Sequence, residues 1–180
     1  MLYEFADLID PTRLPKRRRY WHYYIVGFVD GVGCFSVSIK KQDDTKFGWV
    51  IDPVFHVTQS KERHIILELL KRTFKCGRII PKPGQEDKVL QYIVDSRRSL
   101  SETIIPFFEK NKPVAKWQEF QFFKKIVNSL EKGEHKTFTG ITKLLREAYE
   151  MSNDRKLPLE EILAQIQQRV DASETIRRAP

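Results

Sequence analysis

The chain has 180 residues, of which 41% are hydrophobic, and this size suits one domain with a full hydrophobic core. Its apolar runs are too short to span a bilayer, and Cys34 and Cys76 are too few for a disulfide framework or a zinc site, so we expect an intracellular protein without a membrane partner. A formal net charge of +8 favours a polyanionic partner such as nucleic acid.

Residues 1–19 are predicted to form a basic N-terminal arm, because Pro11 and Pro15 oppose a continuous helix there. The run Lys16–Arg19 stays solvated, lies along phosphates or acts as a nuclear localisation signal. This cluster follows the apolar residues of the N-terminus, which is the reverse of the order in a secretory signal. A main domain over 20–153 and a helical tail over 154–180 complete the predicted organisation.

The segment Tyr24–Ile39 joins a helical pattern to a strand pattern. A helix is predicted from about Arg19 to Asp30, with Gly27 and Gly31 on one face. Glycines on one helical face let another backbone approach closely. The approaching backbone is either a second subunit or another helix of the same chain.

A strand to about Lys41 and a polar turn over 42–46 follow this helix, and further strands and helices then alternate. The later elements are predicted as a strand at 49–59, a helix capped by Ser60 and ending near Phe74, strands at 76–81 and 89–95, a helix from the capping box of Ser99 and Glu102 to Lys110, a helix from Pro113, a helix around Ile141–Ala148, and a tail helix at 157–170. The order is αββαββα with added C-terminal helices, which predicts an α+β fold.

Four segments carry a resemblance to one family. The motif IVGFVDGVG at Ile25–Gly33 resembles the motif of the LAGLIDADG homing endonucleases. Phe47–Gln59, Ile104–Lys112 and His135–Asn153 resemble later parts of that family, in the right order. The resemblance implies a LAGLIDADG fold with a four-stranded antiparallel DNA-binding sheet, and Mg²⁺-dependent cleavage of double-stranded DNA.

The sequence holds one copy of the glycine motif. In the family, two such helices pack against each other at the centre of the active molecule. The resemblance therefore implies a homodimer with Gly27 and Gly31 in its interface, and a near-palindromic target.

An exposed antiparallel sheet face fits the major groove of DNA. Counting the strand alternation outward from the apolar positions predicts the side chains that contact DNA; these are Ser36, Ser38, Lys40, Asp52, Val54, His56, Thr58, Arg78, Ile80, Lys82, Gln91, Ile93 and Asp95. The alternative is that they form only the solvated face of an α+β domain. Phosphate contacts are predicted from Arg13, Lys16–Arg19, Lys41, Lys46, Arg63 and Lys116.

The residue between the last two glycines of the motif is Val32, where the family has its metal-binding acid. A valine cannot ligate Mg²⁺, which requires oxygen ligands. The resemblance implies that the Gly31 carbonyl offers one oxygen. Asp30 matches the other acidic position of the motif, and its role is either structural or that of a substitute metal ligand.

Other catalytic positions of the family have counterparts in this chain. Gln59 resembles the residue that orders water near the scissile phosphate, and Arg63 resembles one of its basic partners. The position of the remaining basic partner depends on the anchor of the alignment. Matching back from Leu130 gives Lys116, and counting forward from Pro106 gives Asn111 or Lys112. Each of these side chains also has an ordinary structural role as an alternative.

The sequence therefore predicts a site-specific double-stranded DNA endonuclease of the intron type whose cleavage is impaired at Val32. The alternative is a nucleic-acid binder that does not cut, such as a maturase that splices intron RNA. The predicted compartment is the bacterial cytoplasm, a mitochondrion or a chloroplast, and the sequence does not choose among them.

Overall fold

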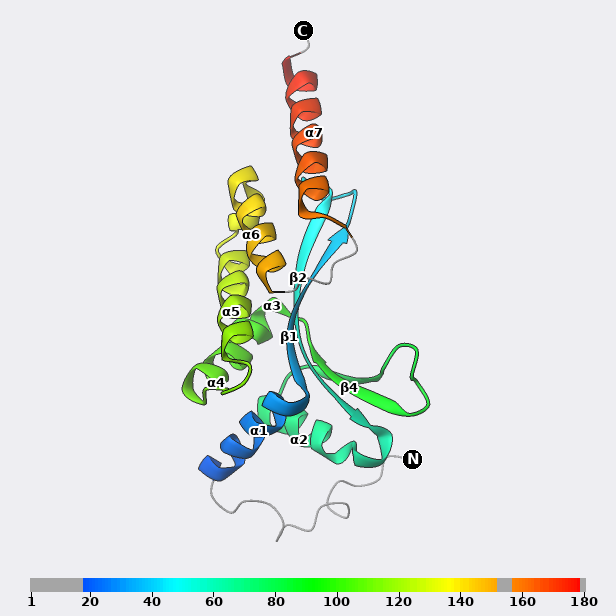
Figure 1. Cartoon of the computed structure of the whole chain (residues 1–180), viewed down its shortest axis with the longest axis vertical. Coiled ribbons are helices and arrows are strands. Elements are labelled where there is room, and N and C mark those ends of the chain that lie inside the picture. The colour runs from blue at the N-terminus through cyan, green and yellow to red at the C-terminus, as the bar shows by residue number, and fades with distance from the viewer. Residues whose placement is uncertain (1–17, 152–156, 179–180) are drawn as a thin grey trace. The chain divides into compact units, whose positions relative to one another are not determined.

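The structure is a computed structural model that describes residues 18–151 and 157–178. Its elements are α1 (Arg18–Val32), β1 (Gly33–Lys41), β2 (Trp49–Ser60), η3 (Lys61–Arg63), α2 (Ile65–Phe74), β3 (Arg78–Pro81), β4 (Val89–Val94), α3 (Arg97–Ser99), η4 (Leu100–Ile104), α4 (Ile105–Lys110), α5 (Trp117–Glu131), η5 (Glu134–Lys136), α6 (Phe138–Glu150) and α7 (Leu159–Arg178). Figure 1 labels the α-helices and the strands β1, β2 and β4. The predicted α+β fold is confirmed.

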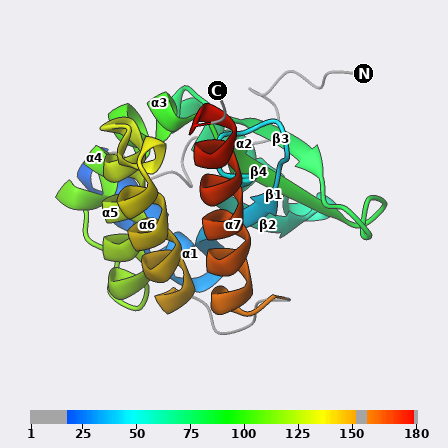
Figure 2. The same cartoon turned by 90° about the horizontal axis from the view of Figure 1, so that it is seen from above.

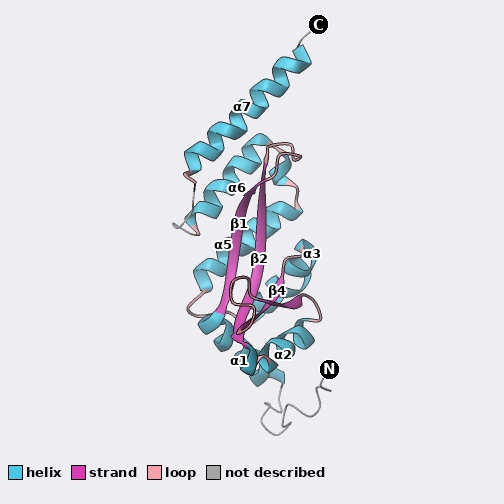
Figure 3. Cartoon of the chain, turned by 90° about the vertical axis from the view of Figure 1, so that its right-hand side faces the viewer, coloured by secondary structure: helices cyan, strands magenta, loops and turns pink. Residues whose placement is uncertain are grey.

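The four strands form one sheet in the order β1-β2-β4-β3, in which β4 pairs antiparallel with both β2 and β3 (Figure 3). Buried and half-buried residues alternate strictly along most of β2, as expected for a strand with one face on a core. The chain divides into two compact units, whose described parts are 18–35 with 54–120, and 36–53 with 121–151 and 157–178. Both β1 and β2 contribute residues to each unit.

The core of the first unit is built from aromatic rings. Phe55 of β2 is fully buried, and its ring centroid lies 5.3 Å from Phe35, 5.6 Å from Phe108 and 6.1 Å from Phe74. Tyr92 of β4 is also buried and stacks on Phe74. These contacts fasten β1, β2, β4, α2 and α4 together, because tilted and edge-to-face rings attract beyond their buried area.

The second unit packs the β1–β2 hairpin residues with the later helices. Trp49 and Leu144 are buried, and α7 runs beside α6 with Ile162 and Ile166 buried (Figure 2). Arg169 of α7 donates to the Asp43 carbonyl in the turn between β1 and β2. The C-terminal helix therefore holds that turn in place.

Two helix starts differ from the sequence prediction. The Ser60 side chain makes no capping bond, and the 3₁₀ segment η3 precedes α2. The cap after β4 is Ser96, whose side chain accepts from the Ser99 backbone amide. Ser99 cannot serve as the cap because its own φ and ψ of −67° and −34° are already helical.

The tail helix is longer than predicted, since it runs to Arg178 and not to Val170. None of the helices within 18–151 and 157–178 is long and apolar enough to cross a membrane. Residues 1–17, with most of the predicted basic arm, lie outside the described part of the chain. Arg18 and Arg19 belong to α1.

Candidate nucleic-acid interface

In the first unit, two rows of side chains cross β2, β4 and β3 on the face turned away from the aromatic core. The strand register gives these rows as His56–Ile93–Arg78 and Thr58–Gln91–Ile80. Each of the six is half-buried or exposed, whereas the intervening Val57 and Tyr92 are fully buried. This part of the sheet therefore has one apolar, packed face and one solvent-facing face of mixed polarity.

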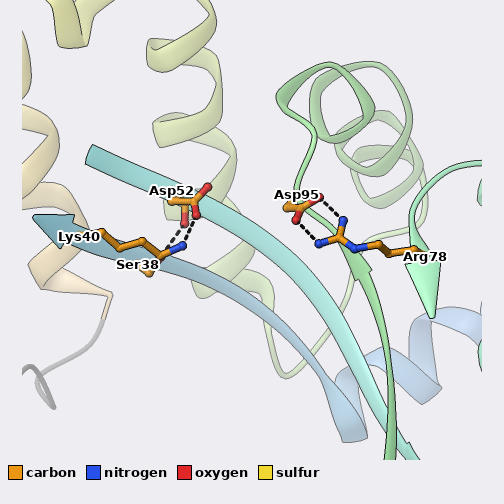
Figure 4. Close-up of polar contacts among 5 residues, drawn as sticks. All are labelled: Ser38, Lys40, Asp52, Arg78 and Asp95. Atoms are coloured by element: carbon orange, nitrogen blue, oxygen red, sulfur yellow. Dashed lines mark hydrogen bonds and ion pairs between the residues drawn. The ribbon is translucent and has the colours of Figure 1, made fainter. Parts of the chain in front are cut away.

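Arg78 and Asp95 form a two-bond ion pair on this face, at the end of the β3–β4 ladder (Figure 4). Nη1 and Nη2 of Arg78 each donate to a different carboxylate oxygen of Asp95, both at 2.7 Å. Their side chains are 54% and 37% exposed. The hydrogen bonds to Asp95 and its charge raise the pKa of Arg78. Two parallel bonds hold the guanidinium plane in one orientation.

In the second unit, Lys40 of β1 and Asp52 of β2 form a single-bond pair, with 2.5 Å between Nζ and Oδ2 (Figure 4). The Ser38 hydroxyl donates to the Asp52 backbone carbonyl at 3.3 Å. Ser36 is half-buried on the same strand. Opposite charges on neighbouring strands attract modestly, so this pair ties two strands together as well as presenting charge.

His56 lies on the outward face of β2 and is electrostatically coupled to Lys82. Burial and then the charge of Lys82 lower the pKa of His56. At neutral pH its imidazole is therefore uncharged, with one nitrogen donating and the other accepting. In the neighbouring row, the Gln91 amide donates to the Thr58 hydroxyl at 3.3 Å.

The glycine face of α1 is open. Gly27 and Gly31 are exposed, and a Cβ atom built on either would have no heavy atom within 4 Å among the described residues. Tyr20 and Tyr24 lie on the same helical face and are 54% and 48% exposed. Sequence reasoning missed these tyrosines, although their spacing of three to eleven residues from the glycines indicates a shared face. No neighbour within the described chain occupies the glycine face.

Asp30 is held by backbone hydrogen bonds. Its carboxylate accepts from the Val114 amide at 2.7 Å and from the Lys116 amide at 3.1 Å. These amides immediately precede α5, and the positive end of the α5 helix dipole also stabilises a negative charge there. The geometry supports the structural role that was one of the two alternatives for Asp30.

Val32 is the last residue of α1, and its apolar side chain is 44% exposed. The described residues contain no group of three or more His, Cys, Asp or Glu side chains arranged to hold a metal. Because the Asp30 carboxylate accepts from two backbone amides, the Gly31 carbonyl is the remaining oxygen among the two metal ligands predicted for the motif. These donors do not fit a Mg²⁺ site.

The predicted catalytic neighbours lie on separate elements of the first unit. Gln59 lies at the end of β2, and its side-chain oxygen accepts from the Ser60 amide at 2.9 Å. Arg63 is exposed on η3. Their catalytic roles stay predictions.

The alternatives for the basic partner all lie between α4 and α5. Lys116 is half-buried, and Lys112 is exposed with its ammonium 5.4 Å from the centre of the Trp117 ring. The Asn111 side chain donates to a backbone carbonyl of α4. Asn111 is therefore used in ending α4, and the choice between the two lysines stays open.

The predicted phosphate contacts are described only in part. Lys41 and Lys46 are exposed beside the turn between β1 and β2. The Lys46 ammonium donates to the Lys136 carbonyl at 3.1 Å. Arg13 lies outside the described residues, as do Lys16 and Arg17.

Helix α1, whose glycine face is covered by none of the described residues, leads directly into a sheet with a polar outward face, an arrangement that suits a nucleic-acid-binding α+β protein. The family model described as LAGLIDADG endonuclease matches residues 25–127, which begin at the first residue of the glycine motif. The chain belongs to this family.

Relatives and solved structures agree with this assignment. Homing endonuclease I-ApeII of Aeropyrum pernix is 35% identical over 147 residues, which are 78% of this chain and 86% of that protein. DNA endonuclease I-CeuI of Chlamydomonas moewusii is 40% identical over 48% of this chain and 39% of that protein. The archaeal intron-encoded homing endonuclease I-Vdi141I, solved in complex with DNA, is 34% identical with a TM-score of 0.80 over 85% of this chain and 98% of that chain. I-SmaMI, solved on an uncleaved DNA target with calcium ions, is 30% identical with a TM-score of 0.72 over 82% of this chain and 49% of that chain.

Proposed function

We propose that this chain recognises one near-palindromic DNA duplex as a homodimer and that it cuts this duplex poorly or not at all. The observation that carries the first part is the outward face of the sheet, where donors, acceptors and two isoleucines cross β2, β4 and β3. Mixed short side chains of this kind match base edges in the major groove, where each base pair presents a distinct pattern. Solved relatives with the same fold are complexes with DNA.

The open face of α1 supports the homodimer. Two glycines and the exposed Tyr20 and Tyr24 form a stripe that nothing in the described chain covers. A second copy of the same helix fits such a stripe, because small residues let two helix backbones approach closely. A two-fold axis through this contact gives both subunits equivalent half-sites, which makes the target nearly palindromic.

Phosphate contacts would come from basic side chains that lie outside the two rows of outward residues on β2, β4 and β3. Lys41, Lys46 and Arg63 are exposed and carry no base-reading role in this scheme. The net charge of +8 predicts that affinity falls steeply with added salt. Such contacts set how tightly the duplex is held and leave its sequence to the sheet.

The impaired cleavage rests on the motif helix. Endonucleases of this family generally depend on a divalent metal. Here the Val32 side chain offers no oxygen at the position of the metal-binding acid, and the Asp30 carboxylate accepts from two backbone amides. The described residues of this chain therefore offer Mg²⁺ no adequate ligand set.

A selection of bound duplexes from a random library tests the binding proposal. The expected result is one enriched, near-palindromic duplex that structured RNA fails to displace. Enrichment of no duplex, or displacement by intron-like RNA, contradicts the proposal. The second outcome would favour the alternative of an RNA-binding maturase.

The cleavage proposal is tested with Val32→Glu, which places a carboxylate where the family has one. On the selected duplex, the natural chain should show little cleavage with Mg²⁺, and Val32→Glu should restore it. Val32→Gln is the matched control, because glutamine has the shape of glutamate without its charge. This variant should stay inactive. Efficient cutting by the natural chain would refute the assignment of Val32 as the defect.

A further inference from the structure

The ion pair between Arg78 and Asp95 has a geometry that the family resemblance does not supply. Arg78 begins β3 and lies opposite Ile93, and Asp95 comes two residues after Ile93, immediately after β4 ends at Val94. The two side chains meet across the strands on the outward face, with both donor–acceptor distances at 2.7 Å. A single-bond pair such as Lys40 with Asp52 allows rotation, whereas this two-bond pair does not.

The pair leaves a second set of donors on the same guanidinium. An arginine carries five N–H groups in a rigid fork. Asp95 takes one hydrogen from Nη1 and one from Nη2. The Nε–H and the second Nη2–H of Arg78 then point together along another edge of the plane. This edge suits a ligand with two acceptor atoms side by side.

Two kinds of DNA group offer two such acceptors. Guanine presents two acceptors, O6 and N7, side by side in the major groove. Adenine presents one acceptor next to a donor, thymine presents one acceptor, and cytosine presents a donor. A phosphate also offers two oxygens. The Arg78–Asp95 pair is neutral as a whole, so its attraction for a phosphate is weak, and the Asp95 carboxylate repels one. Ile93 directly opposite Arg78 is an apolar neighbour that suits a base edge.

We propose that Arg78 reads a guanine in each half-site of the target and that Asp95 is the positioning residue that orients it. The inference rests on the proposed function, since it requires that the sheet face lie in the major groove. In a homodimer the guanine appears twice, at positions related by the two-fold axis.

The experiment is the same random-library selection, run on the full chain and on variants of it. Arg78→Gln should lose about tenfold or more of the preference for guanine at two symmetric positions, and leave the other positions unchanged. Arg78→Lys keeps the charge but not the rigid fork, so it should keep its salt dependence and retain only part of the guanine preference, because a lysine ammonium can still donate to guanine. Asp95→Asn should reduce the guanine preference at the same two positions by a smaller factor.

Arg98→Gln is the matched control. Arg98 also pairs with a carboxylate, through Nε to both oxygens of Glu102 at 3.1 and 3.0 Å, but it lies in α3 and not on the sheet. This variant loses the same charge and should select the same duplex as the natural chain. Thermal unfolding of each variant shows that it is folded.

Three outcomes would overturn the inference. If both Arg78 variants weaken binding to all duplexes alike, Arg78 contacts phosphate. If Asp95→Asn keeps the full guanine preference, the positioning role of Asp95 is wrong. If the variants select the same duplex as the natural chain, the guanine assignment fails while the proposed function stands. Enrichment of no duplex by the natural chain refutes both.

Discussion

Replacing the two exposed motif glycines with alanine should stabilise the single chain and weaken the dimer. Gly27 and Gly31 lie within α1, and a Cβ atom on either has nothing within 4 Å in the described chain. Inside the chain, therefore, Gly27→Ala and Gly31→Ala remove backbone freedom from the unfolded state without introducing a clash.

The expected gain follows from helix propensity. Alanine is more favourable than glycine by about 0.8–1.0 kcal/mol in a helix interior, and Gly31 lies in the last turn, where the effect is smaller. The double variant should gain about 1–2 kcal/mol. For a chain of this size that raises the unfolding midpoint by about 2–8 °C.

The dimer should respond in the opposite direction. Each substitution adds a methyl group where two helix backbones need to touch, and overpacking a close contact costs about 1–3 kcal/mol. The dimer dissociation constant should therefore rise by about 5- to 150-fold for either single substitution, and further for the double variant. Affinity for the selected duplex should fall with it, since both half-sites are needed.

The assay combines thermal unfolding over a range of protein concentrations with sedimentation of the free chain. Unfolding in the dilute limit reports on the single chain, and the concentration dependence reports on the dimer. Gly33→Ala is the control, because its Cβ would lie 2.9 Å from the Val29 carbonyl oxygen and 2.7 Å from Val29 Cγ1. That variant should lose stability at every concentration.

Two results would refute this reasoning. A double alanine variant that dimerises and binds DNA like the natural chain would exclude the glycine face as the interface. A double variant that is less stable in the dilute limit would mean that another part of the chain covers Gly27 and Gly31. The homodimer proposal would then lose its structural support.

Two further predictions concern single side chains. Asp30→Ala should lower the free energy of unfolding by about 1–2 kcal/mol in urea titrations, because the two backbone amides before α5 lose their acceptor. Asp30→Asn should lose less, because its amide oxygen can still accept a hydrogen bond. If neither variant loses stability, the structural role of Asp30 is excluded. Because the pKa of His56 is lowered on folding, the folded chain binds its proton less readily, so stability should be full above about pH 6.5 and fall as the pH drops toward the folded pKa. His56→Gln should reduce this fall below about pH 6.5, and an unchanged pH dependence of the stability would contradict the lowered pKa of His56.

Much of the fold follows from local periodicity, which a sequence displays directly. The alternation of apolar residues in β2 predicted which side chains turn away from the core, and the structure has the same alternation. The glycine spacing predicted a helix face that needs a close neighbour. The sequence also shows directly that valine occupies position 32, where the motif of the family has an acidic residue. Caps were harder, because Ser96 and Ser99 compete for one helix start and only the backbone angles distinguish them.

The pairing of distant side chains was decided by the tertiary structure alone. Arg78 meets Asp95 across 17 residues, and Asp30 meets the Val114 amide across 84 residues. Strand alternation tells which face a residue occupies, but the register between two strands depends on the turn that joins them and on the core beneath. The sequence by itself therefore determined the family, the outward face of the sheet and the absence of an acid at Val32. Only the folded chain decided which charged side chains form ion pairs, that the Arg78 guanidinium is fixed by two hydrogen bonds, and that none of the described residues covers the glycine face of α1.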